Sequence, residues 1–401
     1  MSADYDLIVV GAGPAGGTAA LQAAKAGMRV ALIERHRLPR HKTCGGGVPM
    51  AVSADLPHFD PQAHADCTIR FMRHTFRFQQ ACMAPIQAPG DPPDFGLWCV
   101  RRDVFDHALT AAAVNTGAEL FDGLTLETVE PASGAVQVQA RNGLSGAPWR
   151  AVASFVIGAD GANGVVGRQV GLHLSRTEAI ALEALVPHRW GEGHPSLRPD
   201  TIHLEYGAVR NGYAWVFPNA EQLNIGAGFL RAAHPLRGPA VREALMQTIR
   251  AYAAALGLEP DWDRVRFRAH PLPVWSRRNT LDALNARVLL VGDVAALVNP
   301  LFGDGILNAV RSAALAVQCI LEGQPAAYSS RLHSEIGTEL QAASRLSALF
   351  YRLPGECFRY GVTRPTATRT AALLLNGRLK YREIAPRAMR RLMQAITGRR
   401  F

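Results

Sequence analysis

The sequence has little lysine, few cysteines and no long apolar run. The shortage of lysine disfavours a halogenase, the scattered cysteines disfavour zinc and disulfide-rich proteins, and the lack of a long apolar run disfavours a membrane-spanning protein. Only three of its 43 basic residues are lysine. The cysteines are scattered, with no CxxC pair and no histidine at zinc spacing, so neither a structural metal site nor a disulfide framework is indicated. We therefore expect no bound metal and free thiols, as in a reducing cytoplasm. The six cysteines are Cys44, Cys67, Cys82, Cys99, Cys319 and Cys357.

No apolar run reaches the roughly 18 residues that a helix needs to span a bilayer. The longest candidate, residues 287–301, is interrupted by Asp293 and Asn299. The first motif begins only about ten residues after Met1, which leaves no room for a signal peptide before the first strand. The sequence therefore predicts a cytoplasmic protein that is soluble or rests on a membrane.

The chain of 401 residues is 48% hydrophobic and 19% charged, which is ordinary globular composition, and it is too long for one compact core. Its net charge of +10 is concentrated at one end. Residues 331–401 carry 14 Lys+Arg and 4 Asp+Glu, whereas the first 330 residues carry 29 of each. Two interpretations of this basic region stay open, a contact with anionic membranes or a solvated helical face. We expect no nucleic-acid partner.

Residues 5–34 contain every part of a dinucleotide-binding βαβ unit. A short apolar run predicts a buried strand, and it ends at Gly11, Gly13 and Gly16 in GxGxxG spacing. Gly11 permits a tight turn, Gly13 lets backbone N–H groups approach a pyrophosphate, and Gly16 lets helix and strand pack closely. A second apolar strand ends at Glu34, which can accept a hydrogen bond from a ribose 2′-hydroxyl. This acid favours a free hydroxyl, as in FAD or NAD.

The chain up to residue 175 continues with mixed helix and strand signals. Three glycines follow Cys44 directly and invite close approach of the backbone to a ligand. Residues 68–79 alternate as a strand or hairpin, and residues 102–116 have the pattern of a helix. Asn142-Gly143 predicts a hairpin turn before an apolar strand that ends at Asp160-Gly161.

Residues 176–270 change character, because short strands separated by turn signals predict an antiparallel sheet. Tyr213, Trp215 and Phe217 alternate along one strand and project from one face, as part of a core or of a site. The turn 303–305 then opens a long helix that runs to Leu321. The four expected strands are 179–186, 201–206, 213–217 and 223–229.

Several motifs occur in the order typical of one superfamily. Beyond the βαβ unit these are VIGADGANGVVGR (156–168), VLLVGDVAALVNPLFGDGI (288–306), TCGGGVP (43–49), YAWVFPNAEQLNIGAG (213–228) and GRLKY (377–381). The chain resembles the FAD-dependent oxidoreductases of the para-hydroxybenzoate hydroxylase fold, and within them it is similar to the geranylgeranyl reductase family.

The resemblance implies a Rossmann-like FAD-binding domain with a parallel sheet, an inserted antiparallel-sheet substrate domain and C-terminal helices. The fold class is α/β, with an α+β second domain. The boundaries that we expect are 1–66, 96–175 and 271–325 for the FAD-binding domain, 67–95 and 176–270 for the substrate domain, and 326–401 for the basic helical region.

The resemblance also implies which residues meet FAD. Cys44, Gly45 and Gly47 would border the isoalloxazine, and a helix that begins at Gly305 would aim its positive end at the flavin edge where charge gathers on reduction. The remaining assignments are Arg102 to the pyrophosphate, Leu126 to adenine through its backbone, Asp293 to the ribityl chain, Gly305 and Ile306 to the pyrimidine edge, and Ala15 and Asp160 as parts of the first two fingerprints.

The activity that the resemblance implies is reduction of C=C bonds in the prenyl chain of a pigment, quinone or lipid. An unactivated alkene has no carbonyl to accept the charge of a hydride, so a proton must be added at the neighbouring carbon. Cys44 is the candidate donor, because a neutral thiol with a pKa around 8.5 is a weak acid at neutral pH; the alternative is a small packing residue. Tyr213 and Trp215 would line an apolar channel above the flavin.

Other functions stay open. An aromatic monooxygenase or a halogenase of the same fold is the main rival, and a non-catalytic flavoprotein has nothing specific in its favour. A halogenase needs a lysine between flavin and substrate. The chain has only Lys25, Lys42 and Lys380, and Lys25 belongs to a helix end, so the sequence disfavours a halogenase. NADPH and ferredoxin are both open as electron donors.

Overall fold

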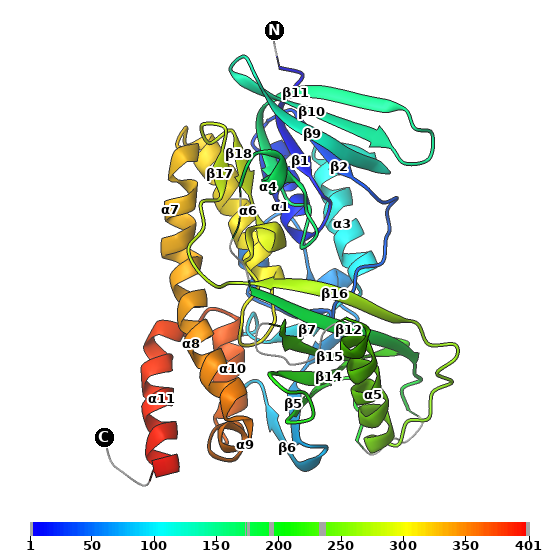
Figure 1. Cartoon of the computed structure of the whole chain (residues 1–401), viewed down its shortest axis with the longest axis vertical. Helices are drawn as coiled ribbons and strands as arrows, with labels where there is room; N and C mark the ends of the chain where they lie inside the picture. The colour runs from blue at the N-terminus through cyan, green and yellow to red at the C-terminus, as the bar shows by residue number, and fades with distance from the viewer. Residues whose placement is uncertain (1–2, 173, 175–176, 192–195, 232–237, 398–401) are drawn as a thin grey trace.

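The computed structural model describes residues 3–172, 174, 177–191, 196–231 and 238–397, and the structural statements below concern these residues. Figure 1 shows one sheet with its helices in the upper half of the molecule and a second sheet below it. The C-terminal helices run along the side of both and end beside the lower sheet. The expected domain boundary at residues 175/176 lies outside the described residues.

The upper sheet has a parallel centre in the order β18-β11-β1-β2-β8, with β17 antiparallel at one edge and β9 and β10 paired beside β11. The central strands are buried on both faces, as expected for a parallel sheet with apolar runs. The strands are β1 (Tyr5–Val10), β2 (Val30–Glu34), β8 (Glu119–Asp122), β9 (Leu124–Ala132), β10 (Ala135–Asn142), β11 (Pro148–Gly158), β17 (Asp282–Ala283) and β18 (Val288–Leu290).

Helix α1 (Pro14–Lys25) lies between α3 (Arg102–Asn115) and α6 (Ile306–Leu321) and packs against the sheet. Its sequence PAGGTAALQAAK is mostly small residues, which lets these neighbours approach closely. At Gly17, for example, a Cβ atom would lie 2.9 Å from Cγ of Leu109 on α3. The helix ends at Lys25, and Gly27 just beyond it adopts a φ of 82°, which suits the chain reversal after a helix. The predicted strand–helix–strand unit is confirmed.

The hairpin predicted at Asn142-Gly143 is present between β10 and β11, but its reversal is wider than a tight turn at that pair. The loop runs through residues 143–147, with the positive φ at Gly146. The side chain of Asn142 instead accepts hydrogen bonds from Leu144 N and Ser145 N, both at 3.0 Å. An asparagine side chain that accepts hydrogen bonds from the backbone N–H groups of the next residues stabilises a longer loop.

The lower sheet has the order β16-β12-β15-β14-β13-β5-β6, and every pairing is antiparallel except β13 with β5. Helix α5 (Pro239–Ala255) covers one face and forms a separate core with it. The strands are β5 (Phe71–Phe76), β6 (Gln79–Pro85), β12 (Thr177–Pro187), β13 (Thr201–Tyr206), β14 (Gly212–Pro218), β15 (Gln222–Leu230) and β16 (Phe267–Val274).

The sequence analysis named neither α5 nor β16. The signal for α5 was available, because Val241, Leu245, Ile249 and Tyr252 recur at helical spacing and are all buried. Strand β16 carries Pro271 and Pro273, which disfavour a strand, and it is tolerated at the edge of the sheet.

A small sheet of β3 (Gly47–Pro49), β7 (Leu97–Cys99) and β4 (Cys67–Ile69) joins the two halves. The short helix α2 (Val52–Asp55) contacts α6, and the short helix α4 (Val166–Gln169) contacts β9 of the upper sheet. The predicted C-terminal helices are present, and they break at Leu353 before Pro354. None of the helices that the structure describes has the length and apolar character to cross a membrane. The C-terminal helices are α7 (Tyr328–Leu332), α8 (Thr338–Arg352), α9 (Pro354–Cys357), α10 (Ala367–Leu375) and α11 (Tyr381–Thr397), with π-helical turns over His333–Gly337 and Phe358–Val362.

Candidate active site

A cavity of about 940 Å³ lies between the two sheets and continues to the C-terminal helices. Of the predicted site residues, all but Gly16 line it. Those that line it are Gly11, Gly13, Ala15, Glu34, Cys44, Gly45, Gly47, Arg102, Leu126, Asp160, Tyr213, Trp215, Asp293, Gly305 and Ile306.

The glycine turn between β1 and α1 has the shape that a pyrophosphate requires. A Cβ atom on Gly11, which has a φ of 102°, would lie 2.5 Å from the carbonyl oxygen of Ala159. On Gly16 it would lie 1.7 Å from the carbonyl oxygen of Gly11, so this residue lets helix and strand pack rather than facing the cavity. On Gly13 it would meet only a guanidinium nitrogen of Arg40, at 3.8 Å. The backbone at Gly13 is therefore open to a ligand, and this cradle fits a dinucleotide.

Glu34 lies at the end of β2, where its side chain is 6% exposed. Its Oε2 accepts a hydrogen bond from Ala12 N at 2.9 Å, and its Oε1 accepts one from His36 N at 3.0 Å. The carboxylate is thus held beside the glycine turn at the cavity wall, as a ribose acceptor would be.

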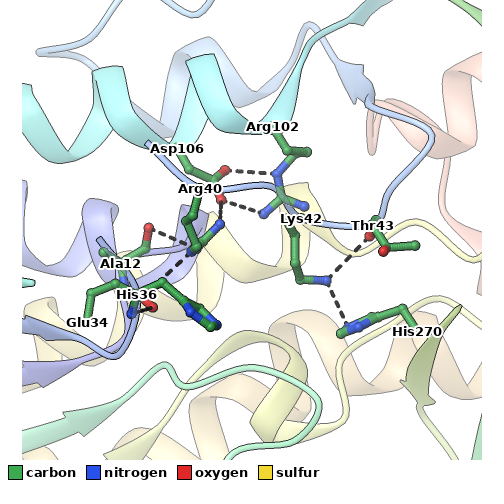
Figure 2. Close-up of polar contacts among 9 residues, drawn as sticks. All are labelled: Ala12, Glu34, His36, Arg40, Lys42, Thr43, Arg102, Asp106 and His270. Atoms are coloured by element: carbon green, nitrogen blue, oxygen red, sulfur yellow. Dashed lines mark hydrogen bonds and ion pairs between the residues drawn. The ribbon is translucent and has the colours of Figure 1, made fainter. Parts of the chain in front are cut away.

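Two arginines share one buried carboxylate next to the glycine turn, as Figure 2 shows. Arg102, the first residue of α3, makes two hydrogen bonds with Asp106, at 2.8 and 2.9 Å. Arg40 Nη1 contacts the same carboxylate at 3.0 Å, and its Nη2 reaches Ala12 O at 3.3 Å. Burial opposes the charge of Arg102, but Asp106 and the nearby Cys44 outweigh it and raise its pKa. Arg40 Nε also lies 3.6 Å from Glu34 Oε2, so Asp106 and Glu34 balance the charges of the two arginines. What the pair offers a diphosphate is guanidinium N–H groups at the cavity wall.

The sequence analysis missed Arg40, Asp106 and the contact of Lys42. Lys42 Nζ lies 2.8 Å from His270 Nε2 on β16 and 3.5 Å from Thr43 O (Figure 2). Burial lowers the pKa of Lys42, and burial together with Lys42 lowers the pKa of His270 to about 3. A neutral His270 therefore accepts a hydrogen bond from Lys42 at neutral pH. The only signal in the sequence was the basic loop RHRLPRHK.

The loop that holds Cys44 is fixed to the lower sheet by a buried polar network. Cys44 N donates to Glu183 Oε2 at 2.9 Å, and Asn224 Nδ2 donates to both Cys44 O and Glu183 Oε2, at 3.0 and 2.9 Å. Asn224 Oδ1 in turn accepts from Trp215 Nε1 at 2.9 Å. His41 Nε2 lies 3.1 Å from the other oxygen of Glu183, which is 1% exposed. The backbone of Cys44 is therefore placed by β12, β14 and β15.

The aromatic stripe of β14 forms the wall opposite this loop. A Cβ atom on Gly45 would lie 2.7 Å from the ring of Phe217, so glycine is required for the loop to pass beneath it. The Tyr213 hydroxyl donates to the carbonyl oxygen of Phe302, and burial raises the pKa of Tyr213. The three stripe residues thus face the cavity rather than a closed core, which the sequence left open.

The start of α6 completes this end of the cavity. Gly305 is its N-cap, and Asp293, from the turn after β18, lies against it, since a Cβ atom on Gly305 would be 3.3 Å from Asp293 Oδ1. The Oδ1 atom of Asp304, the residue before Gly305, is buried without a hydrogen-bond partner in the described part of the chain. Burial raises the pKa of Asp304 to about 7. In the sequence, Asp304 appears only as the middle residue of the turn Gly303-Asp304-Gly305, and the sequence analysis assigned it no role.

Asp160 and Leu126 line the far side, near the glycine turn. Asp160 Oδ2 accepts hydrogen bonds from Val165 N and Val166 N, at 2.5 and 3.0 Å, while its Oδ1 has no partner among the described residues. Burial raises the pKa of Asp160. Leu126 pairs with Ala140 across β9 and β10. No group of His, Cys, Asp or Glu side chains in the described ranges could hold a metal ion.

Comparisons with known proteins place the chain among flavoenzymes. A family model described as FAD dependent oxidoreductase matches residues 6–157, and one described as FAD binding domain matches residues 97–333. The menaquinone reductase of Mycolicibacterium smegmatis is 30% identical over 397 residues, covering 93% of this chain and 90% of that protein. The geranylgeranyl diphosphate reductase of Rhodobacter capsulatus is 31% identical over 344 residues, covering 80% and 77%. A geranylgeranyl bacteriochlorophyll reductase-like protein from Thermoplasma acidophilum has the same fold, with a TM-score of 0.77, 22% identity, and coverage of 96% and 98%.

Proposed function

Since this chain belongs to the FAD-dependent oxidoreductases of the geranylgeranyl reductase family, we propose that it reduces carbon–carbon double bonds in a prenyl chain. The observation that carries this proposal is the shape of the cavity. One end has the glycine turn, the arginine pair and the start of α6, and the rest is a long apolar channel between β13, β14 and the C-terminal helices. A flexible, extended apolar chain is the kind of substrate that such a channel accommodates.

When bound at the first end, FAD supplies the hydride. In the proposed arrangement the backbone at Gly13 with Arg40 and Arg102 holds the diphosphate, and Glu34 holds the ribose. Asp293 would accept from the ribityl hydroxyls, because a carboxylate at a buried strand end costs several kcal/mol if left unpaired. The positive end of α6 would favour negative charge on the flavin edge.

In this proposal Cys44 Sγ holds the proton that the second alkene carbon receives. Its sulfur accepts a hydrogen bond from Gly46 N at 3.3 Å, and its backbone is fixed by Glu183 and Asn224. The negative charge left on the sulfur would lie near the Arg102 guanidinium, which interacts with Cys44. Trp215, which is buried, and Tyr213, which is half-buried, would exclude water from the same region, since both line the cavity.

The experiment is a single turnover without oxygen. The FAD-bound enzyme is reduced with dithionite and mixed with geranylgeranyl diphosphate or a geranylgeranylated quinone, and flavin reoxidation is followed with mass analysis of the product. We expect a gain of two hydrogens per reduced bond. Cys44→Ser should keep its FAD and its reduction by dithionite but lose about a hundredfold or more in the rate of alkene reduction, because a general acid contributes roughly that much.

Cys357→Ser is the matched control. Cys357 lines the same cavity at the end remote from the glycine turn, and burial raises its pKa to about 12, which makes it a poor acid. This variant should react at the wild-type rate. Full turnover by Cys44→Ser would show that the thiol is not the proton donor. In a separate experiment, NADPH and reduced ferredoxin can be compared as electron donors to the wild-type enzyme.

One observation bears on the halogenase alternative. Lys42 lines the cavity, so the small number of lysines does not by itself exclude that chemistry. Its ammonium group is, however, engaged by His270 and Thr43 O on the side of the cofactor loop. A product that carries oxygen or a halogen, formed only in air, would favour the monooxygenase or halogenase over the reductase.

A further inference from the structure

Asp304 is a carboxyl on the cavity wall that the proposed mechanism does not use. The residue is half-buried and lines the cavity, and its Oδ1 atom is buried without a hydrogen-bond partner among the described residues. The backbone of its turn is closed by two hydrogen bonds of 2.9 Å, from Asn299 N to Asp304 O and from Gly303 N to Asn299 O. The turn therefore fixes where the carboxyl lies.

Three other elements hold this turn through tyrosine hydroxyls. Tyr213 on β14 and Tyr351 on α8 each donate to a backbone carbonyl oxygen of the turn. On α11, the hydroxyl of Tyr381 accepts a hydrogen bond from Asn299 Nδ2 at 2.8 Å. Burial raises the pKa of all three tyrosines, so they are neutral at neutral pH and carry no charge that could stabilise an ionised Asp304.

In the part of the chain that the structure describes, the charged groups at this end of the cavity are engaged with one another. The arginine pair shares Asp106, and Lys42 contacts His270. Asp293, which lies against the N-cap of α6, is itself an acid. Burial therefore dominates and raises the pKa of Asp304 to about 7, although a hydrogen bond from its own N–H group acts in the opposite direction.

The residue after Asp304 begins the helix whose positive end faces the cavity. Gly305 is the N-cap of α6, no side chain caps this end, and the first turn has no acidic residue. Gly305, Ile306 and Ala309 all line the cavity. An ionised carboxyl directly before the N-cap would cancel part of the positive potential that α6 offers to the flavin edge. A protonated carboxyl leaves that potential intact.

We propose that Asp304 binds FAD in its protonated form, as a neutral hydrogen-bond donor at the flavin edge, so that FAD binding takes up a proton. A protonated carboxyl can donate one hydrogen bond. FAD in the cavity would displace water from the carboxyl, and loss of water disfavours the ionised form further. The inference rests on the place of FAD in the proposed function and not on the identity of the substrate.

The test measures release of FAD from the FAD-bound enzyme without any substrate. The protein is diluted at pH values from about 6 to about 8, and the rise in flavin fluorescence gives the Kd of FAD at each pH. If only the protonated form of Asp304 binds FAD, the Kd of the wild type should rise about tenfold over this range, because the ionised form becomes the main form of the free protein.

Two variants assign the titration to one residue. Asp304→Asn keeps the size of the side chain and an N–H donor but cannot ionise, so its Kd should stay near the wild-type value at about pH 6 and change less than about twofold up to about pH 8. Glu205→Gln is the matched control, because burial also raises the pKa of Glu205, which does not line the cavity. Its Kd should rise as in the wild type. Both variants retain the other titratable groups of the cavity, which include His36, His41 and Asp160.

Infrared spectroscopy gives a readout that does not depend on dissociation of FAD. At about pH 8 the FAD-bound wild type should show the C=O band of a protonated carboxyl, and this band should weaken when FAD is removed. Asp304→Asn should lack the band, and Glu205→Gln should retain it.

A wild-type Kd that is constant from about pH 6 to about pH 8 would overturn the inference, whatever the variants do. An Asp304→Asn variant with the pH dependence of the wild type would assign the titration to another group, and it would overturn the inference too. Because no substrate is present in these measurements, failure of the enzyme to reduce prenyl chains would not alter them. The proton at Asp304 and the proposed reductase function therefore stand or fall separately.

Discussion

Glu183 gives the sharpest test of how the Cys44 loop is held. Its Oε2 accepts hydrogen bonds from Cys44 N and Asn224 Nδ2, both at 2.9 Å, at a position that is 1% exposed. Glu183→Ala removes the acceptor of both donors. Glu183→Gln keeps an oxygen for them and changes only the group that faces His41 Nε2, 3.1 Å from the other oxygen of Glu183.

The magnitude follows from the two donors that lose their partner. A buried N–H group without an acceptor costs about 1–3 kcal/mol. Because the cavity lets water reach this region, we expect Glu183→Ala to lower the free energy of unfolding by about 2–4 kcal/mol in total. Glu183→Gln should cost about 1 kcal/mol or less. If the loop shifts by even about 1 Å, the rate of alkene reduction should fall up to a hundredfold, since catalysis is that sensitive to position.

The assay combines urea unfolding of the FAD-bound protein with the single-turnover rate at saturating substrate. Glu205→Ala is the matched control, because Glu205 is a buried carboxyl on β13 that accepts from Thr75 Oγ1 and Phe78 N, at 2.5 and 2.9 Å, and does not line the cavity. It should lower stability by a similar amount and leave the rate unchanged. A Glu183→Ala variant with wild-type stability, or with a rate loss no larger than that of Glu205→Ala, would refute the positioning role.

Three further results are expected. Glu34→Ala and Asp293→Ala should each lower the FAD content of the purified yellow protein from about one per chain, measured by absorbance after gel filtration. Burial raises the pKa of Asp304 to about 7, so the folded state favours the protonated carboxyl. The stability that this preference contributes is lost as pH rises from about 4 to about 7, and Tm should fall over that range. Asp304→Asn should make the fall in Tm smaller. The basic region 331–401 should bring the protein onto anionic vesicles at low salt and not at high salt, and equal binding to neutral vesicles would count against an electrostatic contact.

The parts of the fold that the sequence predicted are those in which neighbours along the chain are also neighbours in space. The βαβ unit is complete within residues 5–34, so its strand, its glycine turn and its acid could be assigned from spacing alone. The same holds for the helix that begins after Gly305 and for the break before Pro354. In each case a glycine or proline marks the boundary by a backbone requirement that few other residues meet.

The parts that were missed depend on contacts between distant segments. Arg40 became a candidate only when Asp106, on a helix 66 residues later, proved to be its partner. Lys42 meets His270 across 228 residues, and Asp91 meets Arg369 across 278. No periodicity within one segment reports such pairs, because each residue alone is typical of an exposed basic or acidic surface position.

The position of Cys44 shows why the site could be predicted in part. The sequence placed Cys44 at the cofactor end, because its loop leaves the strand that ends at Glu34. What fixes its backbone, however, is Glu183 and Asn224 on the other sheet, through Trp215 of the same aromatic strand that walls the channel. A change in the channel wall at Trp215 would therefore move the thiol as well as the substrate. If the proposed function is right, affinity for the prenyl chain and placement of the proton are coupled, so substitutions that reshape the channel should alter the rate of reduction even when FAD binding is untouched.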